Sequence, residues 1–190
     1  DAVLHKDKDA SAALTSGGVS GSRLGFKGTE DLGGGLKANF LLEHGFKIDT
    51  GKQGEEGSSF NRQAYVGLSG GFGEFKLGRI WTAYDDISGA TNPVFDSVLS
   101  PTNVWASTGY AANPSNGIYY ASPAMGGVSG AFSTNLKEGS DNQSNAFHVK
   151  YEGGPVYAGV AYQVDKTATG DTKFTRLNGS YDLGAAKLLA

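Results

Sequence analysis

The chain has 190 residues, a formal net charge of −3, 30 glycines and no cysteine. Only 38% of its residues are hydrophobic, which is low for a conventional buried core, and the acidic balance disfavours nucleic acid as a partner. The lack of cysteine excludes a disulfide framework and a thiolate metal site, and no stretch approaches the ~20 apolar residues of a transmembrane helix. A barrel of strands is not excluded by that test, because only alternate residues of each strand would face lipid.

Short glycine-rich turns recur along the chain and predict a series of hairpins. These turns lie at 31–35, 70–73, 124–127, 152–155 and 182–185. Longer polar segments fall between them and are expected to form loops at the opposite end of the strands. These segments lie at 49–59, 137–144 and 165–171. Very short turns at one end and long loops at the other are typical of outer-membrane barrels.

Between the turns, apolar and polar residues alternate with the period of two that indicates β-strands. We expect one set of side chains to face lipid or a subunit interface: Phe26, Phe40, Leu42, Val66, Leu68 and Val149. We expect a second set to face the lumen: Lys27, Lys37, Asn39 and Glu43. A soluble barrel or sandwich would show the same alternation with its faces reversed. The segment at 156–162 is apolar on both faces and is not oriented by its pattern.

Aromatic residues next to the short turns favour the membrane alternative, because barrels in membranes carry aromatic girdles at both interfaces. The girdle residues expected here are Phe72, Phe75, Tyr151, Tyr157 and Tyr181. The sequence therefore predicts an all-β protein with a transmembrane antiparallel β-barrel.

One insertion, at 82–113, interrupts the alternation and contains Pro93 and Pro101. A loop of this length without regular structure is usually functional. The alternative is a disordered surface insertion, but apolar side chains such as Tyr84 give the segment enough apolar surface to pack.

Two blocks of sequence resemble a signature of Gram-negative general porins, of the trimeric type typical of beta-proteobacteria. The first block is SRLGFKGTEDLGGGLKA at 22–38, and the second is RQAYVGLSG at 62–70 followed by FGEFKLGR at 72–79. Tyr119, Tyr120, Ser122 and Pro123 resemble a further strand and turn of the family. The resemblance covers nearly the whole chain.

The resemblance implies a barrel of 16 strands per subunit, assembled as a homotrimer in the bacterial outer membrane among lipid and lipopolysaccharide. It also implies passive diffusion of small hydrophilic solutes and ions, with no cofactor. The segment at 82–113 occupies the position of the family's third loop, which folds into the lumen as a constriction. Residues 1–190 form a single barrel with about ten or eleven strands by spacing, so we expect an incomplete representation of a longer chain.

A group of charged residues is expected to line the constriction of the pore. It comprises Arg23, Lys27 and Arg62 on the wall and Asp85, Asp86 and Asp96 in the loop. Arg62 shares sequence parity with the outward Val66, so it needs a bulge or twist near Gln63 to reach the lumen. We expect a positive wall facing a negative loop, a field that orients dipolar solutes. The alternative is that each arginine merely pairs with a nearby carboxylate.

Two other classes of protein remain open. A soluble all-β binding domain would purify without detergent. An outer-membrane hydrolase would need an imidazole base, and the candidates are His5, His44 and His148. The acidic pairs Asp7 with Asp9 and Asp85 with Asp86 lack calcium-loop spacing. The glycines at 33–35 are not followed by a lysine with serine or threonine after it, and no helix pattern begins there, so we expect neither metal nor phosphate sites.

Overall fold

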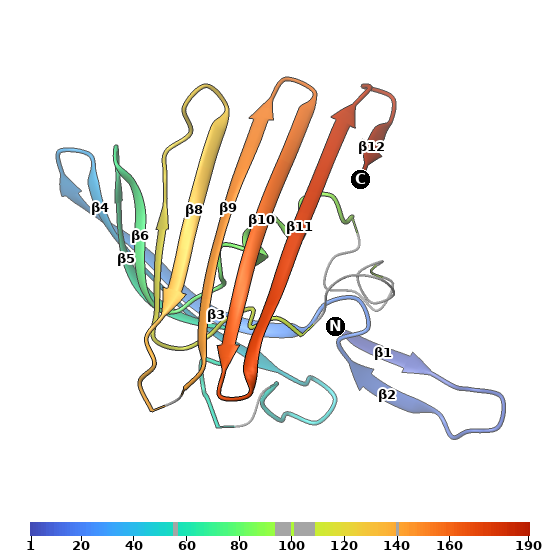
Figure 1. The fold of residues 1–190 in the computed structure, drawn as a ribbon. Coiled ribbons are helices and arrows are strands. Elements are labelled where there is room, and N and C mark those ends of the chain that lie inside the picture. The colour runs from blue at the N-terminus through green and yellow to red at the C-terminus, as the bar shows by residue number, and fades with distance from the viewer. Residues whose placement is uncertain (55–56, 94–99, 101–108, 140) are drawn as a thin grey trace.

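The computed structural model describes residues 1–54, 57–93, 100, 109–139 and 141–190. Within these residues, ten strands form one antiparallel sheet and two form a separate hairpin near the N-terminus (Figure 1). The hairpin strands are β1 (Ala2–His5) and β2 (Ala13–Ser16). The sheet comprises β3 (Ser22–Gly33), β4 (Leu36–Phe46), β5 (Gln63–Gly70), β6 (Gly73–Arg79), β7 (Gly117–Ala121), β8 (Val128–Asn135), β9 (Gln143–Gly153), β10 (Val156–Thr167), β11 (Gly170–Asp182) and β12 (Lys187–Leu189).

Every strand of the sheet pairs with the next strand along the chain, so the sheet is a continuous meander from β3 to β12. The five glycine-rich turns lie between paired strands, as the sequence predicts. At 33–35, three successive glycines have φ values of 85°, 61° and 82°. Residues with a side chain rarely adopt this region, so the glycines serve the tight turn between β3 and β4. No helix among the described residues is long and apolar enough to cross a membrane.

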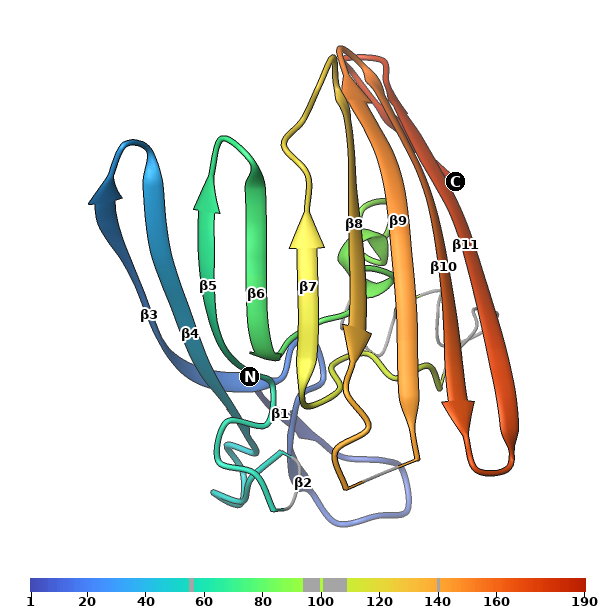
Figure 2. The same cartoon turned by 60° about the vertical axis from the view of Figure 1, so that its left-hand side comes forward.

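The sheet is curved, and the described part of the segment between β6 and β7 lies on its concave side (Figures 1 and 2). This segment, 80–116, contains the 3-10 helix η1 (Asp85–Ile87) and is called the inner loop below. Paired residues on neighbouring strands share a face. The concave face therefore follows the register from Lys76 through Tyr119 and Ser133 to Ala146 and Gln163.

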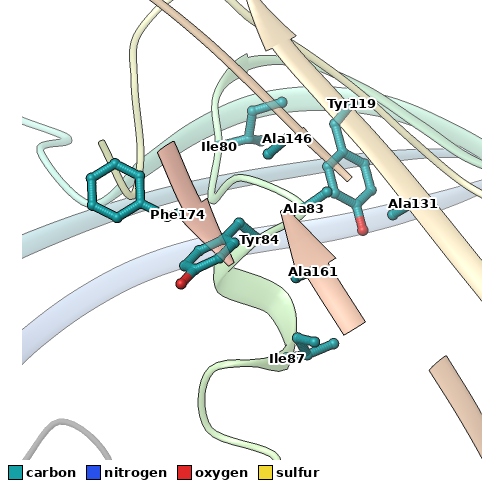
Figure 3. Packing of buried hydrophobic residues seen from close by; sticks show 9 residues of the cluster. All are labelled: Ile80, Ala83, Tyr84, Ile87, Tyr119, Ala131, Ala146, Ala161 and Phe174. Carbon is teal, nitrogen blue, oxygen red and sulfur yellow. The ribbon is translucent and has the colours of Figure 1, made fainter. Parts of the chain in front are cut away.

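The buried apolar core lies where the inner loop meets this concave face (Figure 3). Ala83, Tyr84 and Ile87 of the loop are each 0–1% exposed. They belong to one cluster with wall residues from five strands: Tyr119, Ala131, Ala146, Ala161 and Phe174. The described part of the loop is therefore packed against the wall, and for these residues the alternative of a disordered surface insertion is wrong.

The register confirms the predicted faces of the strands. Phe26 pairs with Leu42, Phe40 with Val66, and these apolar residues lie on the face opposite the inner loop. Lys27 and Lys37 lie on the concave face, and Val66 on the other face is 63% exposed. A sheet with a polar concave face and an exposed apolar convex face is the inverse of a soluble barrel.

Strand β10, which the sequence left unoriented, is oriented by its contacts with the loop. Ala161 and Gln163 are fully buried on the concave face, and Tyr157 has the same parity. The prediction that Tyr157 belongs to an outer aromatic girdle is therefore wrong. Its hydroxyl donates to Asn178 Oδ1 at 3.4 Å, whereas Tyr151 and Tyr181 are on the convex face.

The prediction of a long loop at 165–171 is also wrong. Strands β10 and β11 pair without a break up to Thr167 and Gly170, which leaves a turn of two residues. The Thr167 hydroxyl donates to the Gly170 carbonyl oxygen at 2.9 Å, and Gly170 has a φ of 143°. Threonine hydroxyl contacts and a positive-φ glycine stabilise the turn, although the polar composition is also typical of a loop.

Candidate functional site

The first turn of the inner loop is fixed to strands β8 and β9 by hydrogen bonds through its backbone. The amide of Ala83 donates to Ser133 Oγ at 2.9 Å. The carbonyl of Ala83 accepts a hydrogen bond from His148 Nδ1 at 2.7 Å. Ser133 and His148 are 4% and 5% exposed, so both polar groups of this loop residue have partners in a buried environment.

Strands β10 and β11 hold the loop at three further places. Thr82 Oγ1 donates to Gln163 Oε1 at 2.8 Å, and Gln163 Nε2 donates to the Ala111 carbonyl at 2.9 Å. Gln163 thus bridges the start and the end of the inner loop. On β11, Asn178 Nδ2 donates at 2.6 Å to the carbonyl of Ile87, the last residue of η1.

A second cluster combines a cation with aromatic rings. The guanidinium carbon of Arg176 lies 4.4 Å from the ring centroid of Tyr84 and 5.6 Å from that of Tyr110. The Tyr110 hydroxyl donates to Asp85 Oδ1 at 2.5 Å. Burial, and next to it the negative charge of Asp85, raise the pKa of the Tyr110 hydroxyl, so it remains a donor at neutral pH.

Asp86, a predicted constriction residue, is directed at the wall of the sheet. It accepts a hydrogen bond from the Tyr119 hydroxyl at 2.6 Å and lies 3.7 Å from His148 Nδ1. Burial raises the pKa of Asp86, while the Tyr119 hydrogen bond and the charge of His148 act in the opposite direction. Asp85 and Asp86 therefore both have hydroxyl partners, and Asp96, the third predicted acid, lies outside the described residues.

Arg62 contacts both the wall and the inner loop. Its Nε forms an ion pair with Glu43, and its guanidinium carbon lies 5.4 Å from the ring centroid of Trp81 at the start of the loop. The register of β5 with β4 is unbroken from Gln63 onward, and the irregularity that the sequence predicts lies just before it, where the Arg62 amide also donates to the carbonyl of Glu43, the partner of Gln63. Arg62 reaches the concave face because β5 begins only at Gln63, so the alternation of the strand does not extend to it.

Arg23 and Lys27 lie on the concave face of β3, as their parity predicts. Arg23 pairs with Gly45 in the register, and its guanidinium donates to Ser20 Oγ at 2.7 Å. Lys27 has no hydrogen-bond or ion-pair partner in the part of the chain that the structure describes. Of the three predicted basic residues, only Arg62 has a contact with the loop among the described residues.

Several residues that hold the inner loop were not singled out as site residues from the sequence. They are Ser133, Gln163, Asn178 and Asn61. In the sequence, Ser133, Gln163 and Asn178 occupy the alternate positions of their strands that are expected to face inward, and this position was the available signal for them. Nothing in the local sequence indicated that their partner would be a loop 50 to 91 residues away in the chain.

Two of the three candidate histidines, His148 and His44, contact backbone carbonyls. His148, one candidate base, is buried, and its Nδ1 is bound to the Ala83 carbonyl. His44 Nδ1 contacts the Ser59 carbonyl. Among the described residues, no group of three or more His, Cys, Asp or Glu side chains is arranged to hold a metal ion.

A curved antiparallel sheet with an apolar convex face, a charged concave face and a loop bound inside it is the wall of a β-barrel of the transmembrane type. The family model for Gram-negative porins matches residues 2–190 of this chain. The chain belongs to the Gram-negative porins, and this membership places it in the bacterial outer membrane.

Individual relatives agree with this assignment. The chain is 36% identical to the outer membrane porin protein 32 of Delftia acidovorans, over 98% of this chain and 59% of the relative. It is 30% identical to a major outer membrane protein P.IB of Neisseria gonorrhoeae, over 95% of this chain and 52% of the relative. A solved structure, the anion-selective porin from Comamonas acidovorans, matches with 33% identity and a TM-score of 0.79, over 94% of this chain and 58% of that one. The chain thus spans less than two thirds of these proteins.

Proposed function

We propose that the protein to which this chain belongs forms a water-filled channel for the passive diffusion of small hydrophilic solutes and ions. The observation that supports this most is the attachment of the inner loop to the concave face of β8 to β11 through Ala83, Thr82 and Ile87. A loop held inside a hydrated barrel reduces the cross-section of the pore, and the charged groups around it then select among ions.

The constriction is formed by the inner loop together with the wall residues Arg23, Lys27 and Arg62. Arg23 and Lys27 have no carboxylate partner among the described residues, whereas Asp85 and Asp86 accept hydrogen bonds from tyrosines. The wall side of the passage is therefore positive and the loop side negative but partly compensated. We propose a modest preference for anions, which agrees with the name of the solved porin from Comamonas acidovorans.

The channel acts as a homotrimer in a membrane that contains lipopolysaccharide. The exposed apolar groove on the convex face of β3 to β6, with a volume of about 630 Å³ and residues such as Phe40, Val66 and Leu77, supports burial against lipid or a neighbouring subunit. A native mass of the full-length protein equal to three subunits is expected. A mass equal to one subunit would remove the trimer from this proposal.

Liposome swelling tests the proposed channel function. Full-length protein is reconstituted into liposomes, which are then placed in isotonic solutions of neutral sugars of increasing size. The expected swelling rate exceeds that of protein-free liposomes and falls as the sugar becomes larger, because the pore is narrow and aqueous. Swelling no faster than that of protein-free liposomes would contradict the proposal. The same preparation, assayed for ester and peptide hydrolysis, addresses the alternative of an enzyme based on His148.

A further inference from the structure

Asn61, a residue just before β5, replaces one rung of the β4–β5 ladder with its side chain. The backbone pairing of β4 with β5 ends at Glu43 and Gln63. Beyond it, the Gly45 amide donates to Asn61 Oδ1 at 2.7 Å, and Asn61 Nδ2 donates to the Gly45 carbonyl at 3.0 Å. A carboxamide offers the donor and acceptor that a strand residue would offer. Asn61 is only 3% exposed, so these hydrogen bonds form away from water.

This replacement decides where the side chain of Arg62 lies. If the ladder continued regularly, Arg62 would lie on the convex face with Ala64 and Val66. Instead its amide donates to the Glu43 carbonyl at 3.2 Å, and its side chain lies over Gly45. A Cβ atom added to Gly45 would be 3.1 Å from both Arg62 Cδ and Asn61 Oδ1. The glycine therefore provides the space in which the guanidinium reaches Glu43.

The backbone carbonyl of Asn61 joins the two ends of the inner loop. It accepts hydrogen bonds from Arg79 Nε at 2.7 Å and from Asn113 Nδ2 at 3.2 Å. Arg79 is the last residue of β6, where the loop begins, and Asn113 lies near its return to β7. Asn113 Nδ2 also donates to the Arg62 carbonyl at 2.8 Å. Four segments of the chain thus meet at one buried asparagine.

We propose that Asn61 is the positioning residue for the selectivity of the pore, because it turns Arg62 into the lumen and fixes its place relative to both ends of the inner loop. This inference rests on the proposed channel function and on the role of Arg62 in the constriction. Asn61 does not touch the solute. It acts through Arg62, and a residue that acts through another has no separate effect once the other is removed.

The test is a double-mutant cycle on full-length protein in planar lipid bilayers. The anion-to-cation permeability ratio is obtained from the reversal potential across a KCl gradient for the wild type, Asn61→Ala, Arg62→Gln and the double variant. Arg62→Gln should lower the ratio by about sevenfold, because a unit charge about 7 Å from the ion path changes the local concentrations of anions and of cations about threefold each, in opposite directions. Asn61→Ala should lower it in the same direction, and the double variant should equal Arg62→Gln alone.

The matched control is Asn39→Ala, the same substitution on the concave face of β4. Asn39 Nδ2 donates to Ser69 Oγ at 2.9 Å and has no hydrogen bond to Arg62 or the loop among the described residues. Its permeability ratio should equal that of the wild type. Substitution of a residue that merely supports the barrel would change the heat-modifiable migration of the protein on a denaturing gel. This migration is therefore compared in all variants.

If Asn61→Ala does not fold, Gly45→Ala is the second variant, because its new Cβ, 3.1 Å from both Arg62 Cδ and Asn61 Oδ1, makes the contact between these two side chains and the strand shift. It should lower the ratio in the wild-type background and change nothing in the Arg62→Gln background. Wild-type selectivity in Asn61→Ala or in the substitute Gly45→Ala, or independent effects that multiply in the double variant, would overturn the inference while leaving the channel intact. An unchanged ratio in Arg62→Gln would also overturn it. Absence of any conductance in the wild type would instead contradict the proposed function.

Discussion

At the scale of single residues, the proposed selectivity of the channel depends on which charged side chains have partners. Arg23 and Arg62 both lie on the concave face, and Arg62 is paired with Glu43. A unit charge about 7 Å from an ion in water changes the energy of that ion by roughly 0.6 kcal/mol, about a threefold change in its local concentration. Between the low-dielectric walls of the proposed channel, the effect exceeds this estimate.

We therefore expect the double variant Arg23→Gln and Arg62→Gln to shift the reversal potential in a salt gradient towards cations and to raise the conductance. Both effects follow from removing two positive side chains from a narrow aqueous passage. The matched control is Lys137→Gln, an exposed lysine in the β8–β9 loop. A double variant that selects and conducts like the wild type would show that the two arginines only support the wall.

The sequence predicted the faces of Arg23 and Lys27 because strand parity is a local property. It could not predict how Arg62 reaches the lumen. That depends on the Asn61 side chain, which binds a residue of another strand 16 positions earlier. The sequence also could not predict where the side chains of Asp85 and Asp86 point. Their partners Tyr110 and Tyr119 come close only when the inner loop packs on the wall.

At the scale of elements, the inner loop is held by side chains that also belong to the barrel wall. Ser133→Ala removes the acceptor of the Ala83 amide and leaves a buried donor without a partner, a loss of about 1–3 kcal/mol. We expect this variant to increase the open-channel current noise, because the loop then moves more. Ser129→Ala, on the same strand and face, is the control and should have the noise of the wild type. Equal noise in all three proteins would contradict a role of Ser133 in holding the loop.

The hairpins were predictable as elements because alternation and glycine turns act over a few residues. The segment at 165–171 was not, since the same polar residues fit a loop or a two-residue turn and the pairing of β10 with β11 decides between them. The packing of the inner loop was predictable only as a tendency, from its apolar side chains. The buried position of Tyr84 depends on Phe174 and Arg176, about 90 residues later in the chain.

At the scale of the whole molecule, the two faces of the sheet contact different media. The 190 residues contain no cysteine, so single cysteines can report the medium. Thr29→Cys on the concave face should react rapidly with a charged, water-soluble thiol reagent when the full-length protein is in liposomes. Val66→Cys on the convex face should react slowly, because lipid excludes the reagent and disfavours the thiolate. Equal rates at the two positions would contradict the assignment of the faces.

The central claim is that this wall, with its inner loop, belongs to an open aqueous channel. The most direct test is the single-channel conductance of the full-length protein in planar lipid bilayers at several KCl concentrations. A water-filled pore should give discrete steps of current that grow in near proportion to the conductivity of the bulk solution at high salt. Absence of steps, or steps that do not change with the concentration of salt, would contradict the account.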